Sequence, residues 1–401
     1  MKCVLILQIK VDMMIPKIKL SKICNISMGQ APKGSSYNDV AEGYPLIAGA
    51  GDFGISTPNP KKHTVEPTRL SQVGDLILCI RATIGDLNWS DDEYCLGRGV
   101  AGLRPLPDKV DKNYLWHFLQ SYKDELQKKG TGSTFKQISR LHIEELEVPL
   151  PALKEQKRIA AILDKADAVR RKRQQAIELS EQLLRSVFLD MFGDPVSNSK
   201  GFKLVNISDI GKIITGNTPS RKKEQYYGSE IEWIKSDNIN TPFHYLTKAE
   251  EYLSKEGKLV GRCAPKNSIL ITCIAGSKNC IGNIAMTDRE VAFNQQINAI
   301  IPNEKILLYF LYAQLLFNKG IIQNASTNSM KGMVSKSKLS NIKILLPPIV
   351  EQKKYTQFFS KAVKKLQKDN LAYNELDKLF NALTQKAFRG ELSKQSETEL
   401  A

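Results

Sequence analysis

Residues 149–192 read PLPALKEQKRIAAILDKADAVRRKRQQAIELSEQLLRSVFLDMF, a run that contains no Gly or Pro after Pro151. Apolar side chains recur in it at steps of three and four residues, while Lys, Arg, Glu and Asp fill most other positions. This spacing predicts a helix of about ten turns with one apolar stripe. The predicted stripe consists of Ile159, Ile162, Ala166, Val169, Ala176, Leu183 and Val187. A stripe at heptad spacing needs a partner helix to bury it.

A second stretch of the same chain can provide that partner. Residues 347–389 read PPIVEQKKYTQFFSKAVKKLQKDNLAYNELDKLFNALTQKAFR, again with no Gly or Pro after Pro348. Both stretches begin with a Pro-rich phrase followed by Glu-Gln-Lys, and Glu155 and Glu351 are 196 residues apart. We therefore expect an internal repeat in which each copy ends in a long helix. The predicted second stripe is Tyr355, Phe359, Ala362, Leu366, Tyr373, Leu376, Phe380, Leu383 and Ala387.

The sequence ahead of each helix repeats as well. An early phrase, Gly29-Gln-Ala-Pro32, corresponds to Gly216-Asn-Thr-Pro219 at an offset of 187, whereas later phrases keep offsets of 196 or 197. The second copy therefore carries nine extra residues (196 − 187), which we expect mainly at 235–261. Strand-like runs, polar loops and an aromatic helix-like run, whose rings we expect in the core, predict one α+β domain per copy. The predicted segments are the α+β domains 16–150 and 202–347 and the helical spacers 151–193 and 348–390.

Composition favours a soluble protein with a polyanionic partner. Lys and Arg total 58 against 42 Asp and Glu, which gives a net charge of +16. Such an excess favours nucleic acid over a merely basic surface. The chain is 42% hydrophobic, and no apolar run reaches the roughly 18 residues of a membrane span. The seven Cys lack a Cys-x-x-Cys pair, which favours reduced thiols in the cytoplasm. No signal-peptide cleavage pattern follows Met1, and Met13 or Met14 are alternative start residues.

Loops rich in basic, hydroxyl and amide side chains are the candidate DNA contacts, because such groups suit phosphate and base edges. For any single residue, an ordinary solvated loop is the alternative. The candidates are Lys33, Ser35, Tyr37, Arg81, Arg98, Thr131, Ser133, Thr134, Lys136 and Gln137 in the first copy, and Ser220, Arg221, Lys222, Lys223, Lys278, Gln295, Gln296, Ser329 and Lys331 in the second.

Patterns for catalysis are not evident in the sequence. Gly49, Gly51 and Gly54 spell G-x-G-x-x-G, but Pro58 and Pro60 follow, so no helix opens there to receive a pyrophosphate. We find no Asn-Pro-Pro-Tyr-like methyltransferase motif, no nucleotide-binding P-loop and no His or Cys pattern with metal-ligand spacing. An enzyme with its own converging acid, base or nucleophile is therefore the disfavoured hypothesis, and we assign neither catalytic nor metal residues.

The order and duplication of several phrases resemble type I restriction–modification specificity (S) subunits over about residues 16 to 392. The phrases are Gly-Ser-Thr-Phe-Lys136-Gln, Pro-Leu-Pro-x-Leu-x-Glu-Gln-Lys157, Leu-x-Met-Phe-Gly193-Asp and Leu-Thr-Gln-Lys386-Ala-Phe-Arg-Gly-Glu-Leu392. The resemblance implies two target recognition domains, each reading half of a split DNA site, and two helices forming an antiparallel coiled coil that spaces them. The loops that carry the candidate contacts differ between the copies, so two different half-sites are expected.

The resemblance also implies partners and a division of labour. The S subunit would bind double-stranded DNA and dock two modification subunits, to which restriction subunits add. Adenine methylation and ATP-dependent cleavage would belong to the complex, with S-adenosylmethionine, ATP and Mg²⁺ on the partners and no cofactor in this chain. A specificity subunit of a type IIB enzyme is the alternative, and the partner set would separate the two.

One charged position interrupts both stripes near the middle of each helix. Heptad stepping places Arg173 on the first stripe and Asp369 on the second, and the two are 196 residues apart. In an antiparallel pairing about a pseudo-two-fold axis, residues 173+k and 369−k face each other. We therefore predict an ion pair between Arg173 and Asp369 that helps to set register and orientation.

Overall fold

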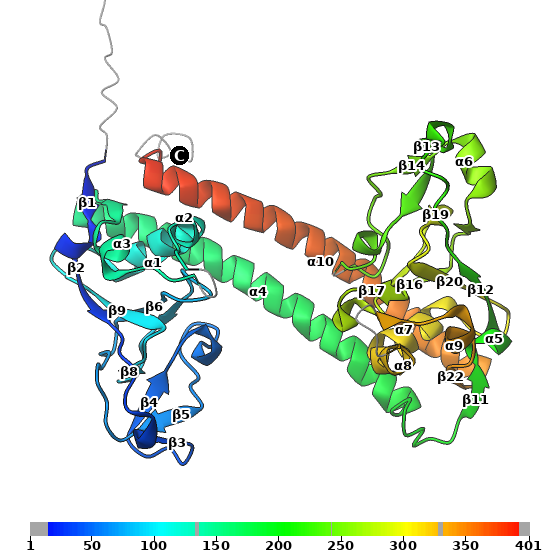
Figure 1. Ribbon diagram of the computed structural model, residues 1–401, viewed down its shortest axis with the longest axis horizontal. Coiled ribbons are helices and arrows are strands. Elements are labelled where there is room, and N and C mark those ends of the chain that lie inside the picture. The colour runs from blue at the N-terminus through cyan, green and yellow to red at the C-terminus, as the bar shows by residue number, and fades with distance from the viewer. Residues whose placement is uncertain (1–14, 133–135, 242, 328–331, 393–401) are drawn as a thin grey trace, which may run out of the picture. The chain divides into compact units, whose positions relative to one another are not determined.

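The computed structural model describes residues 15–132, 136–241, 243–327 and 332–392. The chain divides into two compact units: unit 1 combines the chain up to Lys172 with the chain from Asn374, and unit 2 is Arg173–Tyr373. Two long helices, α4 (Leu153–Phe192) and α10 (Ile349–Arg389), cross this division, so each unit contains part of both helices and one α+β body (Figure 1). Each helix ends at a glycine with a left-handed backbone, Gly193 (φ 72°) and Gly390 (φ 82°).

Unit 1 builds its α+β body from three sheets in its described part. One sheet has the antiparallel order β2-β9-β6-β7, the second has the order β3-β5-β4-β8 with β4 parallel to β8, and β1 pairs with β10. The strands are β1 (Lys17–Lys19), β2 (Cys24–Met28), β3 (Tyr37–Asn38), β4 (Tyr44–Ile47), β5 (Lys62–Thr64), β6 (Leu76–Cys79), β7 (Leu87–Trp89), β8 (Cys95–Leu96), β9 (Val100–Pro105) and β10 (Glu147–Pro149).

Short helices complete unit 1. Asp111 caps the N-terminus of α1 by accepting hydrogen bonds from the backbone N–H groups of Asn113 and Tyr114. The rings of Tyr114 and Phe118 are buried in the core of the unit, as predicted from their spacing. The helices are α1 (Lys112–Ser121), α2 (Lys123–Lys128) and α3 (Arg140–Glu144), with single turns η1 (Leu20–Lys22), η2 (Gly34–Ser36) and η3 (Ala50–Asp52).

Unit 2 repeats the first four-stranded sheet of unit 1 and its two-stranded β1–β10 pairing, while its second four-stranded sheet has the parallel pair in the middle rather than at the edge. Its four-stranded sheets have the orders β12-β20-β16-β18 and β14-β13-β19-β15, with β13 parallel to β19, while β11 pairs with β22 and β17 with β21. The strands are β11 (Lys203–Asn206), β12 (Gly211–Thr215), β13 (Tyr227–Ile234), β14 (Tyr252–Leu253), β15 (Cys263–Ala264), β16 (Ile269–Thr272), β17 (Ile274–Ala275), β18 (Ile284–Met286), β19 (Val291–Phe293), β20 (Ile297–Pro302), β21 (Gly332–Met333) and β22 (Lys343–Leu346).

The helices of unit 2 follow the same plan, because α7, α8 and α9 begin 196 residues after α1, α2 and α3. The stretch 235–261, expected to hold the extra residues, contains η5, β14 and α6. Phe310 and Tyr312 are buried in the core of this unit. The helices are α5 (Ile207–Ile210), α6 (Lys255–Val260), α7 (Leu308–Phe317), α8 (Lys319–Asn324) and α9 (Lys336–Ser340), with single turns η4 (Glu224–Tyr226), η5 (Ser236–Asn238) and η6 (Lys278–Cys280).

A buried glutamine ties the start of each long helix to its α+β body. Gln156 accepts a hydrogen bond from the Asp111 N–H at 2.9 Å and donates to the carbonyl oxygens of Lys109 and Pro151. Gln352 makes the equivalent three contacts in unit 2. This explains why the Glu-Gln-Lys phrase occurs in both copies: the amide satisfies backbone groups that the buried junction would otherwise leave unpaired.

The long helices pair antiparallel in each unit, as the sequence predicted. In unit 1, Arg170 Nη1 lies 3.0 Å from Asp377 Oδ1, and Arg158 donates to the Leu392 carbonyl oxygen. In unit 2, Tyr355 donates to the Leu184 carbonyl oxygen at 3.2 Å. Partner numbers fall on one helix as they rise on the other, which only an antiparallel pairing produces.

The predicted stripe of α10 is confirmed, but that of α4 is wrong at Val169, Ala176 and Leu183, which are exposed. On α10, Tyr355, Phe359 and Leu366 are buried as expected. On α4, the predicted Val169 and Leu183 are each 54% exposed. The inner face of α4 instead carries Leu163, Ile177, Leu184 and Phe188. Each of them lies one residue after a residue of the predicted stripe.

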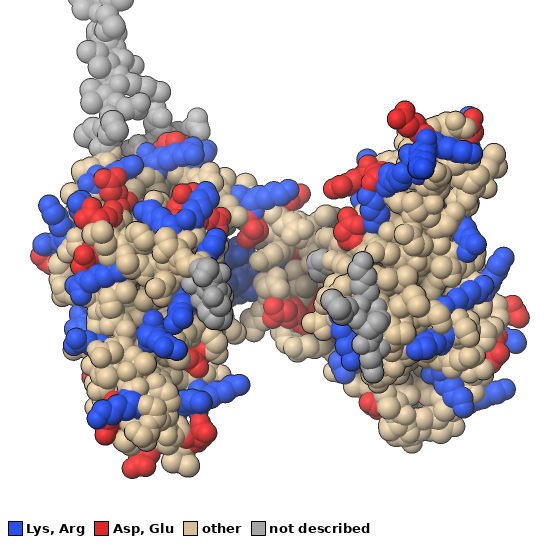
Figure 2. All heavy atoms as spheres, viewed as in Figure 1, with Lys and Arg blue, Asp and Glu red and all other residues tan. Residues whose placement is uncertain are grey.

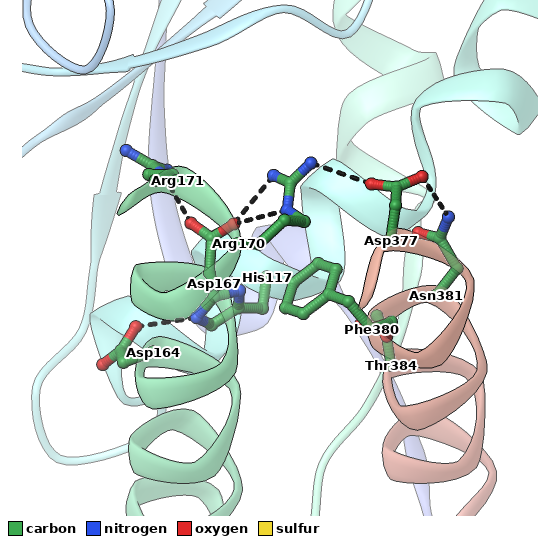
Figure 3. Close-up of polar contacts among 9 residues, drawn as sticks. All are labelled: His117, Asp164, Asp167, Arg170, Arg171, Asp377, Phe380, Asn381 and Thr384. Atoms are coloured by element: carbon green, nitrogen blue, oxygen red, sulfur yellow. Dashed lines mark hydrogen bonds and ion pairs between the residues drawn. The ribbon is translucent and has the colours of Figure 1, made fainter. Parts of the chain in front are cut away.

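Unit 1 carries charged side chains on the inner face of α4 (Figure 3). Asp167 is 5% exposed and accepts hydrogen bonds from Arg170 and Arg171, while Arg170 also reaches Asp377 on α10. The guanidinium of Arg170 lies 5.2 Å from the ring centroid of Phe380. Buried Asp167 is therefore neutralised within unit 1 by two arginines, of which Arg170 also bridges to the partner helix.

Candidate nucleic-acid interface

The predicted DNA contacts lie on loops at strand ends, and most of their side chains are exposed. Lys and Arg are spread over the visible face of each unit, with Asp and Glu among them (Figure 2). The candidates Ser133, Thr134, Ser329 and Lys331 lie outside the described residues. The others are considered below by the backbone that positions them.

A tight turn, residues 97–100, connects β8 to β9 and carries Arg98 at its tip. The Val100 N–H donates to the Gly97 carbonyl at 3.2 Å, and the Gly97 N–H donates to Ile47 at the end of β4 at 2.8 Å. Gly29 donates to Val100 at 2.9 Å and packs so closely that a Cβ there would lie 2.1 Å from the Gly97 oxygen. Backbone contacts from two other strand ends therefore fix this turn.

The same turn occurs in unit 2 between β19 and β20, with Gln295 at its tip. The Ile297 N–H donates to the Asn294 carbonyl at 3.2 Å, and the Asn294 N–H donates to the Ile234 carbonyl at 3.0 Å. Gly216 donates to Ile297 at 3.0 Å, and a Cβ on Gly216 would lie 2.1 Å from the Asn294 oxygen. Each contact that fixes the first turn thus has a counterpart in the second.

A cavity of about 960 Å³ adjoins the turn of unit 1. Tyr37, Arg81 and Arg98 line it, and Gly49, Gly51 and their neighbours form part of its wall. Gly49 and Gly51, two of the three glycines of G-x-G-x-x-G, therefore contribute open space next to basic side chains, and the helical element that begins within the motif is only the single turn η3. The structure brings together three predicted contacts that lie far apart in the sequence.

The loop near Lys136 is joined to the same region by backbone pairing. Arg81 and Thr131 each form a β-bridge with Gln137, and the Ala82 N–H donates to the Lys136 carbonyl at 3.0 Å. In unit 2 the corresponding pairing is the short ladder of β17 with β21. Arg81, Thr131, Lys136 and Gln137 therefore form one continuous candidate surface in unit 1.

Arg221 in unit 2 has partners within its own domain. Its guanidinium lies 2.7 Å from Glu251 and stacks over the rings of Tyr227 and Trp233, at 4.4 and 4.8 Å from their centroids. The hydrogen bonds from Arg221 and Lys235 lower the pKa of Glu251. Arg221 is consequently held in a defined position by a carboxylate that it shares with Lys235. Lys223 lies over the ring of Tyr226, while Ser220, Lys222 and Lys278 are exposed.

Burial keeps two thiols and one histidine outside these loops in their neutral forms. Burial raises the pKa of Cys24 and of Cys273 to about 12, so both thiols stay protonated near neutral pH. Burial lowers the pKa of His244 to about 4. Within the described ranges, no group of three or more His, Cys, Asp or Glu side chains is placed to hold a metal ion. Nor is any described helix long and apolar enough to cross a membrane.

The profile of the family described as the type I restriction modification DNA specificity domain matches this chain twice, at residues 14–179 and 199–376. The chain belongs to this family. Its two matches together cover most of the sequence and coincide with the two copies of the repeat. The family therefore accounts for the duplication of sheets, short helices and turns described above.

Relatives within the family carry consistent names. The EcoBI specificity subunit of Escherichia coli is 25% identical over 426 aligned residues, covering 96% of this chain and 87% of that protein. A Methanocaldococcus jannaschii protein named for the specificity subunit of the type I restriction enzyme MjaX is 34% identical over 185 residues, but the match spans only 45% of this chain and 44% of that protein. The crystal structure of a type I S subunit from M. genitalium shares the fold, with a TM-score of 0.62 at 16% identity, covering 95% of this chain and 98% of that one.

The repeat offset of 197 aligned the two turns of this specificity-domain fold in the sequence, but it did not show that the same backbone contacts anchor both. Gly97-Arg-Gly99 and Asn294-Gln-Gln296 share no residue, so similarity between them is not visible locally. The signal for these shared contacts is the pair Gly29 and Gly216, which stand at matching places in the repeat. Each glycine permits the same close approach of backbone to the turn.

Proposed function

We propose that this chain is the DNA-recognition subunit of a type I restriction–modification complex, reading a bipartite, asymmetric site with one half-site per α+β domain. The observation that carries the proposal is the duplicated framework with unlike tips. The same backbone turn presents Arg98 in unit 1 and Gln295 in unit 2. A shared framework with different tip chemistry suits two different half-sites on one continuous DNA.

The chemistry would belong to partner subunits in the cytoplasm. Two modification subunits would bind S-adenosylmethionine and methylate adenine, and restriction subunits would use ATP and Mg²⁺ to cleave DNA. The paired helices α4 and α10 would space the two domains and offer their outer faces for docking. Exposed apolar residues on these helices support a docking role, among them Val169, Leu179, Leu183, Leu371 and Leu379.

A domain exchange tests the assignment of half-sites. The chain would be produced with its modification subunits in a host without adenine methylation, and methylated bases would be mapped by single-molecule sequencing. Replacing 16–150 with the first domain of another specificity subunit should change one half of the methylated motif only. The matched exchange of 202–347 should change the other half. If either exchange altered both halves, the assignment of one half-site per domain would be wrong.

Identification of co-purifying chains tests the partner set. Separate modification and restriction polypeptides are expected after purification of this chain from its host. A single polypeptide that combines nuclease and methyltransferase would instead indicate the type IIB arrangement.

A further inference from the structure

The two turns at residues 97–100 and 294–297 share five anchoring backbone hydrogen bonds. Besides the contacts described above, Gln30 donates to the Leu96 carbonyl at 2.8 Å, and Asn217 donates to the Phe293 carbonyl at 3.1 Å. The carbonyl of the residue after each tip is also bonded: Gly99 accepts from the Ile80 N–H at 2.9 Å and Gln296 from the Cys273 N–H at 2.8 Å. Because these backbones are fixed, the Cβ atoms of the two tip side chains are held in defined positions.

At these two turns the tip residues Arg98 and Gln295 are the exposed ones. Arg98 is exposed, and its side chain makes no hydrogen bond or ion pair with any residue in the described ranges. Gln295 is exposed too, with its amide oxygen accepting from the Thr218 hydroxyl. The neighbouring Gln296 side chain is occupied internally, since it accepts hydrogen bonds from Ser236 and Asn294.

Arg and Gln differ in which base edge they match. A guanidinium can donate two parallel hydrogen bonds to O6 and N7 of guanine in the major groove. A glutamine amide can donate to N7 and accept from the N6 amino group of adenine. A neutral amide is a poor substitute for a cation at a phosphate, so a position that alternates between Arg and Gln suits base edges better than the backbone of DNA.

We propose that the tip of this turn is the base-reading position of both units: Arg98 reads a guanine in the half-site of unit 1, and Gln295 reads an adenine in the half-site of unit 2. The proposal rests on the proposed function, because it needs each unit to face one half-site. To that function it adds which residue reads a base, which base it reads and which edge of the base in the major groove it contacts. The open space beside Arg98, lined by Tyr37 and Arg81, leaves room for the base pair that the guanidinium contacts.

Exchange of the tips gives a first test in the complete complex. Arg98→Gln should change a single position of the unit 1 half-site from guanine towards adenine and leave the other half as it is. Gln295→Arg should change one adenine of the unit 2 half-site to guanine. Lys17→Gln, which removes an exposed cation of unit 1 in β1, is the control and should leave the motif unchanged. A preserved motif with uniformly weaker methylation in Arg98→Gln would identify a phosphate contact and overturn the proposal.

Base analogues give a second test, which begins with the wild-type complex. Each guanine of the unit 1 half-site would be replaced in turn by 7-deazaguanine, which lacks the N7 acceptor, and binding of the wild-type complex measured. One position should lose roughly ten- to hundred-fold in affinity, and in Arg98→Gln that loss should shrink to about two-fold or less. 7-Deazaadenine would be tested in the same way in the unit 2 half-site. The loss of affinity at one adenine should disappear in Gln295→Ala, whereas a loss that arises at the methylated base should remain.

The outcomes distinguish the two levels of inference. If the wild-type complex methylates no bipartite motif, the proposed function fails. If it has such a motif, but no 7-deazaguanine position affects binding or the affected position stays sensitive in Arg98→Gln, the assignment of Arg98 is wrong while the proposed function stands. The same comparison with 7-deazaadenine and Gln295→Ala decides the assignment of Gln295.

Discussion

Arg173 Nη1 lies 2.8 Å from Asp369 Oδ1, and the two residues occupy the same position of the repeat, 196 residues apart. The ion pair joins α4 to α10 within unit 2 and matches the pairing expected of an antiparallel arrangement. It is not dry, because the Arg173 side chain is 41% exposed and that of Asp369 is 15% exposed. Its energetic contribution should therefore fall below that of a fully buried pair.

Removing one partner of this pair should destabilise unit 2 moderately. We expect Arg173→Ala to lower the free energy of unfolding by about 1–2 kcal/mol, and Asp369→Ala by less, because the less exposed carboxylate is the costlier group to leave alone. Urea unfolding of the single and double variants gives the coupling energy. The combined Arg173→Leu and Asp369→Leu variant should recover most of the stability while loosening the register. A coupling energy of zero would show that the pair has no role in the helix pairing.

Loss of the buried glutamines should weaken each junction independently. Gln156 and Gln352 are each 1% exposed, and Gln156→Ala leaves the Asp111 N–H and two carbonyl groups without their partner. We expect a loss of about 2–3 kcal/mol, mainly the cost of unpaired buried groups. Hydrogen exchange followed by mass spectrometry should show faster amide exchange in unit 1 for Gln156→Ala and in unit 2 for Gln352→Ala. Equal increases in both units for either variant would contradict independent junctions.

The glycines behind the turns should tolerate no side chain. In Gly29→Ala and Gly216→Ala the new methyl group would lie 2.1 Å from a backbone oxygen of the turn, so the turn or the strand end must move. Each variant should lose about 1–3 kcal/mol of stability and blur one half of the methylated motif. Gly34→Ala and Gly276→Ala are matched controls, because nothing lies within 4 Å of their added Cβ. If Gly29→Ala behaved like Gly34→Ala, the turn would not be held by this contact.

The sequence predicted the repeat and the stripe of α10 but misplaced that of α4, and the reason is physical. Asp167 and Arg170 occupy the inner face of α4, where a search for apolar residues passes over them and selects Val169 instead. The residue 196 positions after Asp167 is Val363, which is 1% exposed, so the same repeat position is charged in unit 1 and apolar in unit 2. Burial of Asp167 depends on Arg170 and Arg171 of α4, and Arg170 in turn depends on Asp377 of α10, so spacing along one helix does not contain that information.

The candidate site was predictable as a set of exposed loops but not as an arrangement. Residues such as Arg98 and Lys136 could be chosen by type and by their place between strands. That Gly29 packs on the turn of Arg98, and that Arg81 bridges to Gln137, depends on hydrogen bonds between residues far apart in the chain. Local patterns also could not show that Arg221 is already paired with Glu251.

The loop near Lys136 should contribute to DNA affinity without contributing to specificity. Lys136 is exposed on the surface that includes Arg81 and Gln137. We expect Lys136→Ala to weaken binding of every sequence alike and to reduce the slope of log affinity against log salt concentration by about one. Lys17→Ala should leave the slope unchanged. Titrations from low to moderate salt measure both, and an unaltered slope for Lys136→Ala would remove this loop from the interface.

His244 should make the stability of unit 2 depend on pH. Its side chain is 8% exposed, its Nδ1 lies 3.2 Å from the Tyr312 hydroxyl, and its Nε2 has no hydrogen-bond partner among the described residues. Burial lowers its pKa from 6.5 to about 4. Between these pH values the unfolded chain binds a proton that the folded chain does not. The stabilisation that His244 contributes is therefore fully present above about pH 6.5 and is lost as pH falls towards 4. The slope from this residue approaches 1.4 kcal/mol per pH unit at most. Urea unfolding of wild type and His244→Asn between pH 7 and pH 4.5 should show a steeper decrease for the wild type, whereas parallel curves would mean that His244 is protonated as readily in the folded chain as in the unfolded one.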